Sequence, residues 1–391
     1  MKKDDQTGLL LLGIGGGGSL LVAAIKAFYG AKMRAICIDT DALSSRELAP
    51  DGVTCLLLGG SRLNGHGAGG DAVQGRLAAQ DDMRNLVPQL EGVRTVVIIA
   101  CLGAGTGGGV TPEIVKMLHD MGIAVLCFVT MPFAFEGDSR RKAAERVLPL
   151  IEENADSLVI IPLDDLFKDV NEALLSEALK FSERFVAAGV TLLWRLITNP
   201  GFIQLDAERL HNMVLHGGMA RFSFSLGQGE DRARKAMEML CNSCLLQKSE
   251  SLVNANALMI GILAGKDLRL DEISEIMKGI RKKCKAECHL EMGTVLDQTF
   301  EGRIELVALV FESWTAAVKT DVKMDGASAL ESASVESFPI QPGNRKGRVR
   351  TSKLSFGVTG RGKFQNVEST LYLGMDLDVP TYYRRNITLD R

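Results

Sequence analysis

The feature that most constrains this chain is a glycine loop that directly follows an apolar run. Leu9–Ile14 is typical of a buried strand, and residues 13–18 (Gly-Ile-Gly-Gly-Gly-Gly) then open a helical pattern. Glycines let a backbone approach a phosphate closely, and the N–H groups of a helix N-terminus then face the anion. The loop also fits the dinucleotide fingerprint, because Asp39 follows at about the distance of a ribose-binding acid. One loop therefore leaves two alternatives, a nucleoside triphosphate site and an NAD-dependent oxidoreductase.

Two further glycine loops favour the triphosphate. Residues 103–109 (Gly-Ala-Gly-Thr-Gly-Gly-Gly) follow the apolar run 95–100 and precede another helical pattern, and residues 65–70 lie between the two loops. A dinucleotide fold needs one phosphate loop. Three glycine-dense loops near strand–helix junctions predict a cradle around a longer polyphosphate.

The rest of the chain predicts an α/β fold. Apolar runs at 9–14, 35–38, 95–100, 124–129 and 157–161 alternate with helical patterns such as 110–121 and 140–153, which predicts a parallel sheet covered on both faces. A long apolar helix at about 169–198 ends at Asn199-Pro200-Gly201. Residues 202–316 form a second α/β unit, with strands expected at 221–226, 257–264, 286–293 and 303–311 and helices at about 231–240 and 271–282.

Composition narrows the function classes. A formal net charge of −3 and an aromatic content of 5% argue against nucleic acid as a partner. Four of the eight cysteines lie in or beside apolar runs, as small buried side chains do in a reducing compartment. Cys241 with Cys244 and Cys284 with Cys288 leave a zinc site as an alternative. The glycine loop interrupts the apolar N-terminus and argues against a secretory signal, and no apolar run reaches the length of a membrane span.

At this point the chain resembles the FtsZ/tubulin family. The glycine loop 13–18, Asp39-Thr40-Asp41, the loop 67–70 and the loop 103–109 are similar to the nucleotide loops of that family, and 103–109 resembles its signature Gly-Gly-Gly-Thr-Gly-[Thr/Ser]-Gly. Residues 132–137 (Pro-Phe-Ala-Phe-Glu-Gly), 198–201, 229–233 and 267–272 match further segments in order. The resemblance covers about 8–316 and a motif in the tail.

This resemblance implies a tubulin-like fold and a function. The expected parts are a Rossmann-like GTP-binding domain (1–168), a central helix (169–198), a C-terminal activation domain (199–318), a disordered linker (319–365) and a partner-binding peptide (366–391). The implied protein is a GTPase that binds GTP or GDP, with Mg²⁺ as a candidate companion ion. It polymerises head to tail with itself into the division ring, in the cytoplasm at mid-cell.

The resemblance also assigns nucleotide contacts residue by residue. Glu136 would hold the ribose, Arg140 would contact the nucleotide, and Glu183 would accept bonds from guanine, with Phe181 as a candidate for stacking on the base. Leu163 stands where the family has a base-binding asparagine, which leaves guanine selectivity open. The complete set of expected contacts is Gly15, Gly16, Gly17, Gly18, Asp41, Ala68, Gly69, Gly70, Gly103, Ala104, Gly105, Thr106, Gly107, Gly108, Gly109, Glu136, Arg140 and Glu183.

Hydrolysis in the family is completed by a loop from the neighbouring subunit, and that loop is altered here. Gln204 occupies the position of the family's Asn, Asp206 matches the family's first Asp, and Arg209 occupies the position of its second Asp. Glu208 is a candidate replacement acid, and Arg209 a candidate for stabilising phosphate charge in the transition state. The expected catalytic set is therefore Asp206, Gln204, Glu208 and Arg209. A paralogue that binds GTP and forms a scaffold with little or no hydrolysis is the alternative.

The tail carries a last motif. Residues 376–385 (Asp-Leu-Asp-Val-Pro-Thr-Tyr-Tyr-Arg-Arg) resemble the C-terminal peptide through which the family binds membrane-tethering division proteins, so contact with the membrane is expected to be indirect. Residues 344–367 of the linker carry seven basic residues and no acid. They are expected to be solvated or to touch an acidic surface weakly.

Overall fold

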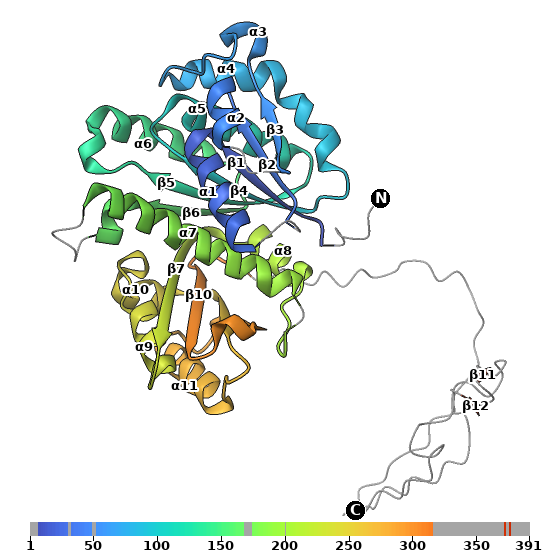
Figure 1. Cartoon of the computed structure of the whole chain (residues 1–391), viewed down its shortest axis with the longest axis vertical. Helices are drawn as coiled ribbons and strands as arrows, with labels where there is room; N and C mark the ends of the chain where they lie inside the picture. The colour runs from blue at the N-terminus through green and yellow to red at the C-terminus, as the bar shows by residue number, and fades with distance from the viewer. Residues whose placement is uncertain are drawn as a thin grey trace, which may run out of the picture. The chain divides into compact units, whose positions relative to one another are not determined.

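A single mixed sheet runs through the folded part of the chain. Its strands are β1 (Leu9–Ile14), β2 (Ala35–Asp39), β3 (Thr54–Leu57), β4 (Thr95–Cys101), β5 (Ala124–Met131), β6 (Ser157–Pro162), β7 (Gly218–Gln228), β8 (Ala257–Ala264), β9 (His289–Leu296) and β10 (Arg303–Phe311). They form a ten-stranded sheet in the order β3-β2-β1-β4-β5-β6-β7-β10-β8-β9. Figure 1 shows this computed structural model.

The structure describes residues 7–29, 33–48, 52–167, 174–199 and 201–315, with 371–372 and 375–376. The chain separates into one compact unit, 1–320, and a second unit, 321–391. In the second unit the described residues form the two-stranded antiparallel pair β11 (Leu371–Tyr372) and β12 (Met375–Asp376). The predicted linker 319–365 and almost all of the peptide motif 376–385 lie outside the described residues.

The predicted parallel sheet is confirmed. Strands β1 to β6, with β7, pair in parallel, while β10 runs antiparallel to β7 and β8. β1, β8 and β10 have the predicted bounds. β9 begins three residues after its predicted start, because Ala286 and Cys288 lie in a turn closed by the bond from Cys288 N to Lys285 O. β3 was not predicted; it is four residues long and half-exposed at the sheet edge.

Helices cover both faces of the sheet. Successive side chains of a strand point to opposite faces, so a strand that is buried throughout must be covered on both sides. Leu9 and Leu11 face one core with the helices α1 (Gly15–Tyr29) and α7 (Leu175–Thr198), whereas Leu10 and Leu12 face a second core. The helices over that second face are α4 (Ala72–Asp82), α5 (Gly105–Asp120) and α6 (Asp138–Glu152). Each of the four leucines is essentially inaccessible, so both faces of β1 are buried.

Helix α7 joins the two halves of the sheet. Its 24 residues carry the buried side chains of Val186, Val190 and Leu193, which share one core with β1 and with β8 of the C-terminal half (Figure 1). Residues 168–173 are not described, so the predicted start of this helix at 169 lies outside the described residues. Its observed end at Thr198 agrees with the predicted one.

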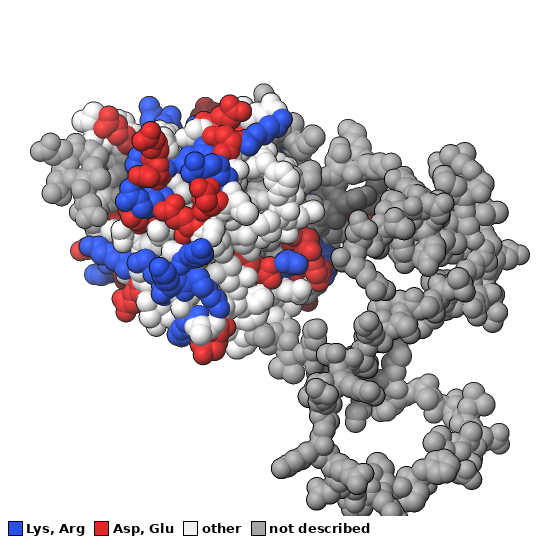
Figure 2. All heavy atoms as spheres, turned by 90° about the horizontal axis from the view of Figure 1, so that it is seen from below, with Lys and Arg blue, Asp and Glu red and all other residues white. Residues whose placement is uncertain are grey.

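The C-terminal half carries a third core beneath α9 (Arg232–Cys241) and α11 (Leu270–Arg281). Ile276 and Ile280 of α11 are buried, while Lys278 and Lys282 of the same helix are exposed. This spacing is that of an amphipathic helix on a sheet. Seen from below, the surface of the molecule carries basic and acidic side chains in adjoining patches (Figure 2). None of the described helices combines the length and apolarity that a membrane crossing requires.

Candidate functional site

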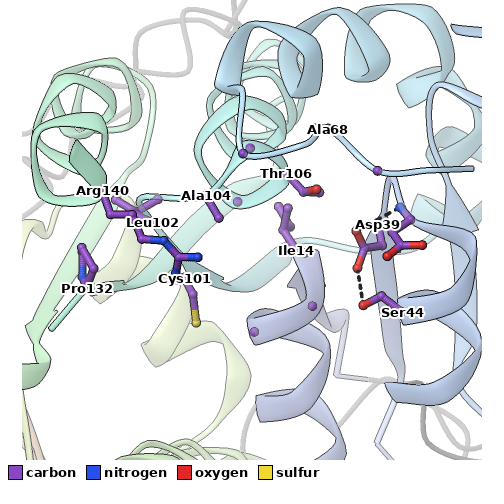
Figure 3. Close-up of a pocket in the computed structure, with 18 of the residues that line it drawn as sticks. Ile14, Asp39, Ser44, Ala68, Cys101, Leu102, Ala104, Thr106, Pro132 and Arg140 are labelled. Carbon is purple, nitrogen blue, oxygen red and sulfur yellow. Dashed lines mark hydrogen bonds between the residues drawn. The ribbon is translucent and has the colours of Figure 1, made fainter. Parts of the chain in front are cut away.

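A cavity of about 570 Å³ opens at the carboxyl ends of β1, β2, β4 and β5. Open parallel sheets bind their ligands at this edge. All three predicted glycine loops contribute to its wall, through residues 15–17, 67–70 and 105–107. In Figure 3, Asp39 and Ser44 lie on one side of the cavity, and Pro132 and Arg140 on the other.

Two long helices begin at this cavity. α1 starts at Gly15 and α5 at Gly105, and neither has an acidic residue in its first turn. Each helix N-terminus presents unpaired N–H groups and roughly half a positive charge. Because neither first turn holds a carboxylate of its own, both ends favour an anion in the cavity.

The two loops approach each other closely enough to require glycine. Gly15 has φ of 74°, and a Cβ added there would lie 3.3 Å from the backbone nitrogen of Gly107. A Cβ on Gly107 would lie 2.1 Å from the carbonyl oxygen of Cys101, which no side chain tolerates. The cradle therefore exists only with a bare backbone at these positions, and its residues fit a phosphate chain.

Thr40 links two of the three glycine loops. Its hydroxyl lies 2.7 Å from that of Thr106 and accepts a bond of 3.1 Å from Ala68 N. Its carbonyl oxygen accepts a bond from Gly67 N. Thr40 is fully buried, so these bonds link the end of β2 to the second and third loops behind the cavity wall. The family resemblance covered the Asp39-Thr40-Asp41 segment but gave Thr40 no role.

The carboxylate of Asp39 accepts hydrogen bonds from residues of its own loop. Its carboxylate accepts bonds from Thr40 N at 2.7 Å and from the Ser44 hydroxyl at 3.2 Å (Figure 3). Burial raises the pKa of Asp39 above its ordinary value, and the backbone bonds oppose that rise. The carboxylate that an NAD site would turn toward a ribose is thus used to shape the loop.

The other end of the cavity is lined by side chains instead of glycine backbone. Pro132, Phe133, Leu163 and Leu179 line it together with the ion pair of Glu136 and Arg140, whose Oε2 and Nη1 atoms are 2.5 Å apart. Leu179 on α7 was missed by the sequence analysis. Phe181, the expected stacking residue, is not among the described lining residues; its ring contacts those of Phe167 and Phe185.

Most of the predicted contacts do meet in this cavity. The predicted residues that line it are Gly15, Gly16, Gly17, Asp41, Ala68, Gly69, Gly70, Ala104, Gly105, Thr106, Gly107, Glu136 and Arg140. The predicted residues outside the lining are Gly18, Gly103, Gly108, Gly109 and Glu183. Gly18 serves packing instead, because an added Cβ would lie 2.5 Å from Ile99 O. Gly108 and Gly109 line a separate cavity of about 380 Å³ among α4, α5 and α6.

The predicted hydrolysis loop lies elsewhere, at the start of α8 (Ala207–Leu215). Asp206 is the N-cap of this helix and accepts a bond of 2.8 Å from Arg209 N. Glu208 pairs with Arg94, which lowers the pKa of Glu208, and Arg209 pairs with Glu291 at 2.6 Å. Gln204 is exposed. Each charged residue of the loop is therefore held by a partner within its own chain.

This loop lies near the amino ends of the parallel strands, and the cavity lies at their carboxyl ends. Arg94, the partner of Glu208, immediately precedes β4, whereas Cys101 at the end of β4 lines the cavity. The seven residues of β4 span about 20 Å at about 3.3 Å per residue. One chain cannot bring its own loop to its own cavity in this fold.

The cysteines give no support to zinc. Among the described residues, no group of three or more His, Cys, Asp or Glu side chains is placed to hold a metal ion. The thiol of Cys288 donates to the carbonyl oxygen of His289 at 3.7 Å. Cys101 lies in the cavity wall, where burial raises the pKa of its thiol.

Comparisons with known proteins agree with this architecture. Residues 9–171 match the family model described as "Tubulin/FtsZ family, GTPase domain", and residues 218–312 match "FtsZ family, C-terminal domain". The chain is 30% identical over 338 residues to the cell division protein FtsZ of Pseudomonas aeruginosa, covering 86% of this chain and 85% of that one. It is 33% identical over 290 residues to FtsZ of Buchnera aphidicola, covering 73% and 74%.

Solved structures show the same likeness. The FtsZ dimer of M. jannaschii is 26% identical with a TM-score of 0.74, covering 79% of this chain and 89% of that one. A GTPγS-bound protofilament of CetZ2 from Haloferax volcanii shares the fold at 21% identity, with a TM-score of 0.61 and coverage of 77% and 92%.

Proposed function

The chain belongs to the tubulin/FtsZ family of GTPase-domain cell division proteins, and from that premise we propose that it assembles head to tail around bound GTP. GTP occupies the 570 Å³ cavity, with its phosphates on the glycine loops. The hydrolysis loop of the next copy closes the cavity from above. GTP is hydrolysed at this joint, so the nucleotide state controls the stability of the filament.

The observation that carries the proposal is the separation of the two half-sites. The glycine-loop cavity lies at the carboxyl ends of the parallel strands, and an exposed acidic loop lies near their amino ends. Contacts between unlike surfaces that do not close a ring generate filaments. Phe202 beside the loop is 86% exposed, which supplies apolar surface for such a joint.

Asp206 is the residue that we assign to the reaction in the neighbouring copy. It is exposed, it is acidic, and its cap on α8 fixes its position. Its carboxylate would orient the attacking water, with Gln204 and Glu208 beside it. Arg209 would stabilise charge on the transferred phosphate if it leaves Glu291.

Further parts of the proposal follow the family. Asp41 offers carboxylate oxygen, the ligand type that Mg²⁺ prefers, in the cavity wall. Residues 1–168 form the nucleotide domain, 169–198 the central helix and 199–318 the activation domain. The linker 319–365 carries the peptide 366–391 to a membrane-tethering division protein at mid-cell.

The test measures pelleting and phosphate release in the same tube. We expect GTP to drive wild-type protein into sedimentable polymer and to be hydrolysed there. Asp206→Asn should lower phosphate release per pelleted subunit by about 10²-fold. Asparagine retains the N-cap, so thermal unfolding should stay unchanged and a folding defect is excluded.

Two outcomes would contradict parts of this proposal. Polymer that forms equally without nucleotide would refute the coupling between nucleotide and assembly. Polymer that requires GTP but releases no phosphate would instead identify a non-hydrolysing scaffold.

A further inference from the structure

The two ends of the cavity differ in what they offer a ligand. The phosphate end is bare backbone and helix N-termini. The far end, where the base of a bound nucleotide would lie, is formed by the side chains of Pro132, Phe133, Leu163 and Leu179. Phe133 is buried and Leu179 is 49% exposed, so the aliphatic and aromatic surface faces the cavity mouth as well as its floor.

The acids near this end already have protein partners. Asp164, next to Leu163, accepts bonds from Ala134 N at 3.0 and 3.2 Å. Glu136 accepts bonds from Phe133 N at 3.0 Å and from Arg140 at 2.5 Å. Of the described residues named at this end, the charged ones are therefore bonded within the protein, and Pro132, Phe133, Leu163 and Leu179 are apolar.

Glu183, the expected guanine contact, does not line this end of the cavity. It stands one helical turn beyond Leu179 on α7, and it lies outside the described lining of the cavity. Leu179 occupies the position on this helix that reaches the cavity. Leu179, and not Glu183, is therefore the described residue of α7 that a ligand in this cavity can touch.

Resting on the proposed function, we propose that this site selects nucleoside triphosphates by their phosphates and by purine shape, and that Leu163 keeps its discrimination among purine bases weak. Guanine, hypoxanthine and adenine all present similar apolar faces to Leu163 and Leu179. They differ in edge groups that leucine cannot hydrogen-bond.

Physical chemistry sets the size of the effect. A site that hydrogen-bonds a distinguishing group rejects the analogue lacking it by about 10⁴-fold or more, because its own buried polar atoms are left unpaired. An apolar wall leaves nothing unpaired and discriminates by only about 10–200-fold. We place this site at the low end, within about tenfold between GTP and ATP.

The experiment measures displacement of a fluorescent GTP analogue by GTP, ITP and ATP from the full chain. Wild-type protein should bind all three within about tenfold of one another. Leu163→Asn, similar in size but carrying an amide donor and acceptor, should change the GTP-to-ATP affinity ratio by about tenfold. Leu148→Asn is the matched control, because Leu148 on α6 is half-buried like Leu163 and lies outside the lining of this cavity, and it should leave the ratio unchanged.

The outcomes separate this inference from the proposed function. A wild-type preference for GTP above about 10³-fold would overturn the inference while leaving GTP-driven assembly intact. So would an unchanged ratio in Leu163→Asn that unfolds at the wild-type temperature. A chain that binds none of the three would overturn the proposed function itself.

Discussion

The hydroxyl of Thr40 is the smallest feature on which the site depends. It contacts Thr106, 66 residues away, and Ala68, 28 residues away, and it is completely buried. A buried hydroxyl that loses its partners costs about 1–3 kcal/mol, and the groups left behind lose theirs as well. The loops 65–70 and 103–109 are therefore joined through one oxygen atom.

Replacing Thr40 by Val tests this arrangement. Valine has the same shape but no hydroxyl, so Ala68 N and Thr106 Oγ1 lose a shared partner. We expect the free energy of unfolding to fall by about 2 kcal/mol and the affinity for GTP to fall by about tenfold. Denaturant unfolding and nucleotide titration measure the two quantities.

Thr40→Ser serves as the control for this change. It keeps the oxygen and removes only a methyl group, so its affinity for GTP should stay near that of wild type. A Val variant that bound GTP as tightly as the Ser variant would show that the loops are positioned without Thr40.

At the scale of elements, helix α7 fits the sheet through a glycine. Gly189 lies where an added Cβ would be 2.0 Å from the ring of Phe222 on β7. That ring also packs edge-on against Phe128 and Phe185, with centroids 5.3 and 5.9 Å away, so it has no free direction to move. The absence of a side chain at Gly189 lets the central helix lie close to the sheet.

Gly189→Ala should therefore destabilise the protein. Although alanine favours a helix by about 1 kcal/mol over glycine, overpacking against a fixed ring costs about 1–3 kcal/mol, and a contact this short places the cost at the upper end. We expect a net loss of about 1–2 kcal/mol in the free energy of unfolding, measured by denaturant titration.

Gly279→Ala in α11 is the matched substitution with the opposite expectation. Its added Cβ would meet the flexible end of Met237, which can turn away. Stability should be unchanged or raised by up to about 1 kcal/mol. Equal losses in both variants would mean that the Phe222 contact is not the cause.

The elements that local patterns determine were the ones predicted well. β1 and β8 are apolar runs interrupted only by a glycine, and β10 carries an apolar run at 306–311 after Arg303 and Glu305; the predicted ends of all three were correct. β3 is only four residues long and half-exposed at the sheet edge, and the sequence analysis overlooked the short apolar run 55–58 that marks it. The glycine loops were predictable because close backbone approach excludes every other residue.

The parts of the site that depend on distant contacts were not predictable. The position of Thr40 between two aspartates gives no sign of Thr106, which only the folded chain brings near. On α7 the sequence analysis assigned Glu183 to the base and offered Phe181 for stacking, while Leu179 lines the cavity. Two residues turn a helix by about 200°, so a small error in helical phase exchanges the inner side for the outer one.

At the scale of the whole molecule, the fold places the glycine-loop cavity and the acidic loop before α8 at opposite ends of the strands of the sheet. The ion pairs of Glu208 with Arg94 and of Arg209 with Glu291 fix the loop before any second copy arrives. A preformed loop loses little conformational freedom on binding, which favours association. Each copy would supply the loop for one joint and the cavity for the next.

Mixing two inactive variants tests this division of labour. Ala104→Asp places a carboxylate at the N-cap of α5 in the phosphate end of the cavity, where it repels the ligand while aspartate still suits an N-cap. Asp206→Asn leaves the cavity intact and removes the acid from the loop. Alone, each variant should release phosphate at least about 10²-fold more slowly than wild type.

In an equal mixture, activity should return. A joint between the cavity of an Asp206→Asn copy and the loop of an Ala104→Asp copy contains only intact parts. Random pairing makes up to about a quarter of all joints of this kind, so phosphate release should approach about a quarter of the wild-type rate. A mixture as inactive as its components would mean that each chain completes its own site, although in this fold the cavity and the loop lie about 20 Å apart along β4.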